Sequence, residues 1–135
     1  MLTVCNFHYI RNNFNSLFPS IFGVTPKDFE NQLRELAKTG IFINQKDLID
    51  NTDAVLNSSQ NHILITFDDG LKEQFELAKP ILDQLNIKAI YFINSINFIK
   101  KKVSVVHKIH LLRSIFTSKE LLFHIQNFFK DKKIN

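Results

Sequence analysis

Residues 63–70 read Ile-Leu-Ile-Thr-Phe-Asp-Asp-Gly, and this stretch decides the fold. The apolar run that begins it predicts a buried strand, and Asp68 and Asp69 follow where that strand should end. Because an unpaired buried carboxylate is costly, we expect the two to be paired, hydrated or bound to a cation. Ligands of α/β folds bind at the carboxyl ends of strands. The alternative is a tight turn without a function, since Asp and Gly both suit turns.

Downstream, a helix is predicted over residues 72–85, and Pro80 should kink or divide it. Residues 88–94 (KAIYFIN) then predict the next strand. A strand, a helix and a strand at this spacing form a βαβ unit, so the two strands should be parallel.

Upstream, residues 2–9 predict a strand, residues 26–39 a helix, and residues 41–43 a short strand. Thr25 can cap the helix, Pro26 suits its first position, and Gly40 is expected to end it. The alternation of strand and helix predicts an α/β fold, with one mainly parallel sheet and the helices outside it.

Two further helices are predicted at residues 103–115 and 118–130, joined by a short link as a helical hairpin. They carry nine large apolar side chains, which are Leu111, Leu112, Ile115, Phe116, Leu121, Leu122, Ile125, Phe128 and Phe129. Exposed apolar surface of this kind indicates a partner or self-association. A non-catalytic interaction module is therefore an alternative function, and ultracentrifugation would detect self-association.

The net charge is +4, and Lys supplies 14 of the 17 basic residues. A nucleic-acid surface more often uses Arg, so no nucleic-acid partner is expected. We interpret the basic runs 100–102 and 130–133 as solvated ends of helices. We find no signal peptide and no apolar run long enough to span a membrane, so a cytoplasmic protein is expected.

The stretch ILITFDDG, followed by ELAKPILDQLNIKAIYFIN, resembles the polysaccharide deacetylase family. Upstream, a strand ending Phe7-His8-Tyr9 and the helix PKDFENQLRELAKTG fit the same pattern. The resemblance covers residues 2–94. It implies a deformed (β/α) barrel and a metal-dependent hydrolase that removes acetyl groups from N-acetylated sugars.

The resemblance assigns Asp68 as the catalytic base and Asp69 as a ligand of a divalent metal, zinc or similar. Chemistry agrees with this division, because a cation lowers the pKa of bound water and a neighbouring carboxylate accepts the proton. An unrelated acidic metal or phosphate site is disfavoured, since such sites usually separate their carboxylates by one residue.

The sequence departs from the family pattern, which completes the metal site with two His residues four positions apart. His107 and His110 are three apart and more typical of a helix surface, although residues i and i+3 do share a helix face. His8 ends the first strand and could face the same site, although a strand-end His is more often packed or solvent-facing.

We therefore expect residues 1–135 to be a single, truncated deacetylase-like domain, with residues 103–130 as a helical insertion. Such a chain would hold half of the site, bind metal weakly and turn over little or no substrate.

Overall fold

The computed structural model describes residues 1–17, 21 and 23–132, which divide into two compact units. The first unit comprises residues 1–12 and 23–95, and the second comprises residues 13–22 and 96–135. Each unit is described separately.

The first unit is built around the strand β3 (His62–Phe67), which pairs in parallel with three other strands. Strand β1 (Leu2–Phe7) runs along the whole length of β3, with Leu2 opposite His62 and Phe7 opposite Phe67. Strand β2 (Ile41–Phe42) pairs with the start of β3, and β4 (Ala89–Tyr91) pairs with its end. The predicted mainly parallel α/β sheet is confirmed.

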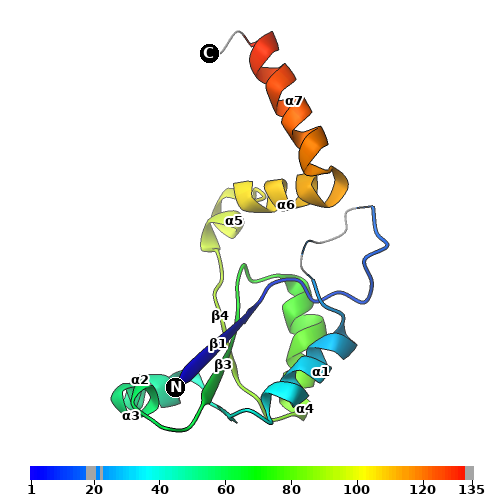
Figure 1. Cartoon of the computed structure of the whole chain (residues 1–135). Coiled ribbons are helices and arrows are strands. Elements are labelled where there is room, and N and C mark those ends of the chain that lie inside the picture. The colour runs from blue at the N-terminus through cyan, green and yellow to red at the C-terminus, as the bar shows by residue number, and fades with distance from the viewer. Residues whose placement is uncertain (18–20, 22, 133–135) are drawn as a thin grey trace. The chain divides into compact units, whose positions relative to one another are not determined.

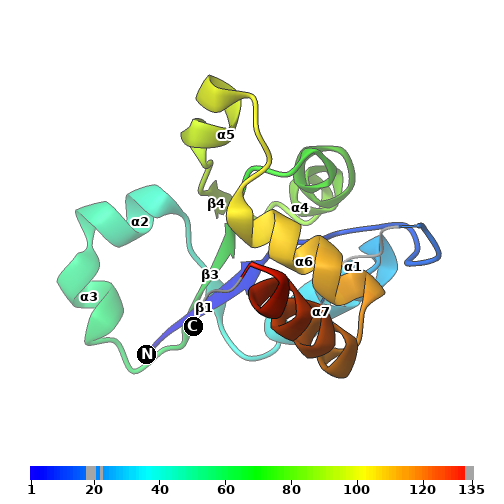
Figure 2. The ribbon, with the colours of Figure 1, turned by 90° about the horizontal axis from the view of Figure 1, so that it is seen from above.

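Helices cover both faces of this sheet (Figures 1 and 2). On one face lie α1 (Pro26–Leu36) and α4 (Lys79–Gln84), and on the other lie α2 (Gln45–Asp50) and α3 (Thr52–Leu56). Because side chains alternate along a strand, β3 serves two cores. Ile63, Ile65 and Phe67 pack on the side of α1 and α4, and Leu64 packs with Val55 of α3.

The start of α1 has the predicted cap, since Thr25 Oγ1 accepts a hydrogen bond from the Asp28 amide. The helix ends at Leu36, however, and not next to Gly40. Gly40 has a different role, because a Cβ there would lie 2.3 Å from the carbonyl oxygen of Asn61. The glycine permits the close approach of these two loops.

The helix predicted over residues 72–85 is divided, as the position of Pro80 indicated. Residues Gln74–Ala78 form a π-helical turn, and α4 begins at Lys79. Pro80 lies in the first turn of α4, directly after the π-helical turn.

In the second unit, α5 (Ser95–Lys100) precedes α6 (Val105–Ile115) and α7 (Ser118–Asp131). Thr117 and Glu120 form a capping box that starts α7, so the predicted break between the two helices is present. Figure 1 shows α7 turning away from α6 at this link, so the terminal hairpin is open. None of the three helices has a buried residue.

Candidate functional site

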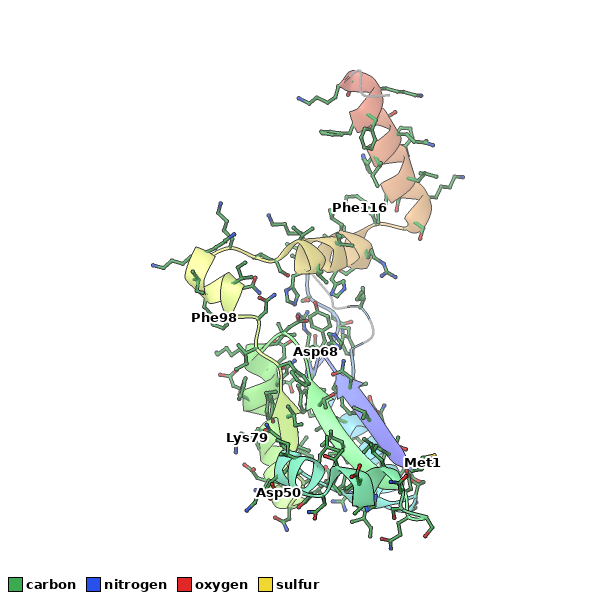
Figure 3. The ribbon with its side chains drawn as sticks, turned by 90° about the vertical axis from the view of Figure 1, so that its left-hand side faces the viewer. Met1, Asp50, Asp68, Lys79, Phe98 and Phe116 are labelled. Atoms are coloured by element: carbon green, nitrogen blue, oxygen red, sulfur yellow. The ribbon has the colours of Figure 1, made fainter. Side chains whose placement is uncertain are left out.

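The candidate site lies at the carboxyl end of the sheet of the first unit. Asp68 directly follows β3, and its amide still donates to the carbonyl oxygen of Phe7 on β1 at 3.2 Å. Figure 3 labels Asp68 at this end and Met1 at the opposite, amino end of the sheet. Asp68 and His8 therefore follow neighbouring strands that end together.

Three side chains organise the Asp68 carboxylate. Asn6 Nδ2 donates a hydrogen bond of 2.8 Å to Asp68 Oδ2, and Thr66 Oγ1 donates to Asn6 Oδ1 at 3.1 Å. The second bond fixes which end of the Asn6 amide faces the carboxylate. His8 Nε2 lies 3.6 Å from the same carboxylate oxygen, and both side chains are 38% exposed. The arrangement is a solvent-accessible carboxylate with a fixed orientation.

The backbone after Asp68 makes a sharp left-handed turn. Asp69 has φ of 76° and Gly70 has φ of 63°, and a Cβ at Gly70 would lie 3.0 Å from the Ile93 side chain. Left-handed backbone is uncommon for a residue other than Gly, although Asp tolerates it better than most. At this turn the Asp68 carboxylate faces Asn6 of β1 and the imidazole of His8.

Gln74 supports the turn from below, and its side chain is fully buried. Its Nε2 donates to the carbonyl oxygens of His8, at 2.9 Å, and of Asp68, at 2.6 Å. Its Oε1 accepts from the Leu71 amide at 3.2 Å. One amide therefore satisfies three main-chain groups and ties together the ends of the two strands that carry the site.

A second group of polar residues borders the turn. Arg11 lies with Cζ 5.0 Å from the centre of the Tyr9 ring, and its Nε is 3.2 Å from Glu73 Oε1. Burial raises the pKa of the Tyr9 hydroxyl, and the negative charge of Asp69 raises it further. The charge of Asp69 thus influences the pKa of Tyr9, which lies two residues after the end of β1.

Of the predicted site residues, Asp68 and His8 come together in the structure. Asp69 is the next residue after Asp68 and lies in the left-handed turn. His107 and His110 lie on α6 in the second unit, with ring centroids 6.1 Å apart, and His107 Nδ1 is 2.7 Å from Ser104 Oγ. The roles assigned to Asp68 and Asp69 remain predictions.

The residues that the structure describes do not fit a complete metal site. Among them, no group of three His, Cys, Asp or Glu side chains is close enough to hold a metal ion. Protein zinc sites normally use three or four such ligands. Asp69 can serve as one ligand, but the described residues do not complete the coordination.

Comparison with protein families supports the resemblance seen in the sequence. Residues 56–115 match the polysaccharide deacetylase family, so the resemblance to that family is confirmed over this segment. No curated protein matches the chain.

Solved deacetylases share the fold. The chain is similar to a de-N-acetylase from Aggregatibacter actinomycetemcomitans, with 15% identity over 93% of this chain and a TM-score of 0.62. It is also similar to the Streptococcus pyogenes deacetylase PplD (20% identity, 76% of this chain, TM-score 0.59) and to IcaB from Ammonifex degensii (23%, 67%, 0.52). The chain spans 50%, 46% and 37% of these three structures, respectively, so its fold is part of a deacetylase barrel.

Proposed function

We propose, from the polysaccharide deacetylase segment at residues 56–115, that this chain supplies one part of the active site of a hydrolase that removes acetyl groups from N-acetylated sugars. The observation that carries the proposal is the Asp68 carboxylate. It is exposed, oriented by Asn6 and next to His8 at the carboxyl ends of two parallel strands.

Asp68 is the proposed base. A carboxylate that takes a proton from water must be accessible to that water and fixed in orientation. The 38% exposure of its side chain provides access, and the Asn6 amide, itself oriented by Thr66, fixes one carboxylate oxygen. The second oxygen is the one that we assign to the proton transfer.

Asp69 is the proposed metal ligand, and a divalent metal in such a site would activate the attacking water. Since the described residues do not complete the coordination, we propose that this chain binds metal weakly and has little hydrolytic activity by itself. His8 is available to the same edge of the sheet, but its imidazole lies against Asp68.

Zinc calorimetry with two matched Asp→Asn variants tests the ligand assignment. We expect weak zinc binding that is lost in Asp69→Asn and retained in the control Asp50→Asn, whose side chain is exposed on α2. Submicromolar affinity, or binding that Asp69→Asn leaves intact, would contradict the assignment.

Hydrolysis of p-nitrophenyl acetate and of N-acetylglucosamine oligomers, with added zinc or cobalt, tests the base. Any metal-dependent turnover should be low and should disappear in Asp68→Asn, while zinc binding survives. Robust turnover by the unmodified chain would show that its site is complete.

A further inference from the structure

The two units of the chain have opposite net charge. Residues 96–135 contain nine Lys and Arg side chains and two carboxylates, for a net charge of +7. Residues 1–95 contain eight basic side chains and eleven carboxylates, for a net charge of −3. Because residues 13–22 carry no charge, these two sums are also the charges of the two units. The modest total of +4 conceals a strongly basic second unit.

Two strongly exposed apolar side chains of that unit are directly next to its basic run. Phe98 is 65% exposed and Ile99 is 78% exposed, at the end of α5. Lys100, Lys101 and Lys102 follow immediately, and all three are exposed. The two apolar side chains suit the acyl-chain region of a bilayer surface. The three ammonium groups that follow them suit the layer of lipid phosphates.

Helix α7 repeats this combination. Leu122, Ile125 and Phe129 lie on one stripe of the helix at spacings of three and four, and each is 46–55% exposed. Lys119 and Lys130 lie about a quarter turn of the helix away from this stripe, on the same face as the exposed Phe123. Helix α7 therefore presents exposed apolar and basic side chains on adjacent faces, a composition that suits the surface of an anionic bilayer.

The link between α6 and α7 adds an open apolar groove of about 660 Å³. Its lining is apolar except for one imidazole, and consists of Leu112, Phe116, Leu121, His124, Ile125, Phe128 and Phe129. Water forms few hydrogen bonds with such a surface. Burial of the groove lining in the acyl-chain region of a bilayer is therefore favourable.

We propose that the second unit binds peripherally to the surface of an anionic phospholipid bilayer. Phe98, Ile99 and the apolar stripe of α7 enter the interface, and the Lys side chains contact the lipid phosphates. Among the described residues, no helix is long and apolar enough to cross a bilayer.

Charge favours lipid over the other occupants of this surface. In an isologous dimer of this unit two surfaces of net charge +7 would meet, and like charges across an interface are costly. Nucleic acid would match the charge but leave the exposed Phe and Ile side chains without a partner. The proposal is independent of the deacetylase site.

Vesicle flotation of the full chain tests the proposal with phosphatidylcholine vesicles that contain or lack phosphatidylglycerol. We expect at least about tenfold stronger partitioning into the anionic vesicles. The variant Lys100→Gln/Lys101→Gln/Lys102→Gln should lose on the order of 100-fold. The matched control Lys27→Gln/Lys46→Gln/Lys88→Gln removes three exposed charges from the first unit and should change partitioning less than about threefold.

The apolar contribution has its own matched pair. Phe98→Ser/Ile99→Ser should lower partitioning at least about tenfold, whereas Ile49→Ser/Leu56→Ser, which alters exposed residues of the first unit, should not. Because the chain contains no Trp, Phe98→Trp places one fluorophore at the proposed anchor. Its emission should shift to the blue with anionic vesicles and be quenched by brominated lipids.

Equal partitioning into both kinds of vesicle, or equal losses in test and control variants, would overturn the proposal. A chain that fails to float and sediments as a dimer would assign the surface to a second copy and also overturn it.

Discussion

The side-chain amide of Gln74 donates a hydrogen bond of 2.6 Å to the main-chain carbonyl oxygen of Asp68. This bond fixes the backbone from which the candidate base projects, although Gln74 does not touch the carboxylate. The same nitrogen also holds His8, so the relative position of the two strand ends depends on one buried side chain.

Gln74→Leu should lower the free energy of unfolding by about 2–4 kcal/mol. Leu has a similar size but cannot pair with the buried main-chain groups of His8, Leu71 and Asp68, and each unsatisfied group is costly. Urea denaturation measures the loss. The control Gln84→Leu, at the exposed end of α4, should change stability by less than about 0.5 kcal/mol. A loss no larger than that of the control would show that water satisfies these groups.

The sequence predicts the strand at Ile63–Phe67 well because its signal is local. Five consecutive buried residues need an unbroken apolar run, and a following Asp-Asp-Gly needs a turn. The position of Pro80 likewise predicts the division of the following helix, since proline acts on its own turn.

The contacts that complete the site are not local and could not be predicted in this way. Asn6 reaches Asp68 only because the register pairs Asn6 with Thr66, and a shift by one residue would send its side chain to the other face. Gln74 resembles any polar helix residue until the ends of β1 and β3 come together above it. The π-helical turn that carries Gln74 has no simple sequence signal either.

Tyr91 carries a buried hydroxyl for which the described residues provide no hydrogen-bond partner. Its ring stacks on Phe67, at 5.0 Å between centroids, and on Phe75, at 4.8 Å. Tyr91→Phe should therefore leave stability unchanged or raise it by up to about 1 kcal/mol, since it removes only the unpaired group. Tyr91→Ala should cost about 2–4 kcal/mol, because it removes the stacked ring. Thermal unfolding of both variants measures the difference, and a substantial loss in Tyr91→Phe would reveal a partner for the hydroxyl.

The ionisation of Tyr9 reports the charge of Asp69. Burial is the larger cause of the raised pKa of Tyr9, and the Asp69 charge adds to it. In a Tyr91→Phe background Tyr9 is the single tyrosine, so ultraviolet absorbance follows it alone. The further change Asp69→Asn should lower the midpoint while leaving it above the ordinary value of about 10.

The same shift predicts how stability depends on pH. A raised pKa in the folded state stabilises the protein fully below the unfolded value, and the contribution is lost as the pH rises through the folded value. Asp69→Asn should therefore reduce the amount of stability that is lost as the pH rises through the pKa of Tyr9. Asp50→Asn serves as the control, and a midpoint that stays constant or rises in Asp69→Asn would place Asp69 too far from Tyr9.

Hydrogen exchange should distinguish the two units, because burial differs between them. Five residues of β3 are buried, and the strand has partners on both edges, so its amides should open only with global unfolding. Residues 103–130 belong to helices without a buried residue, and isolated helices of this length are marginal in water. Their amides should exchange well before those of residues 63–67.

Helix α1 provides the internal control for that experiment. It has the same length as α6, 11 residues, but its Phe29 and Leu33 are fully buried. Length alone therefore cannot explain a difference in exchange between the two helices. We expect the amides of α1 to be protected almost as well as those of β3. The amides of α6 should exchange faster, because α6 has no buried residue. Equal protection of α6 and β3 in the free protein would show that the terminal helices are part of a common core. It would then follow that their apolar side chains are covered within the chain, and that a lipid surface has less of them to bury.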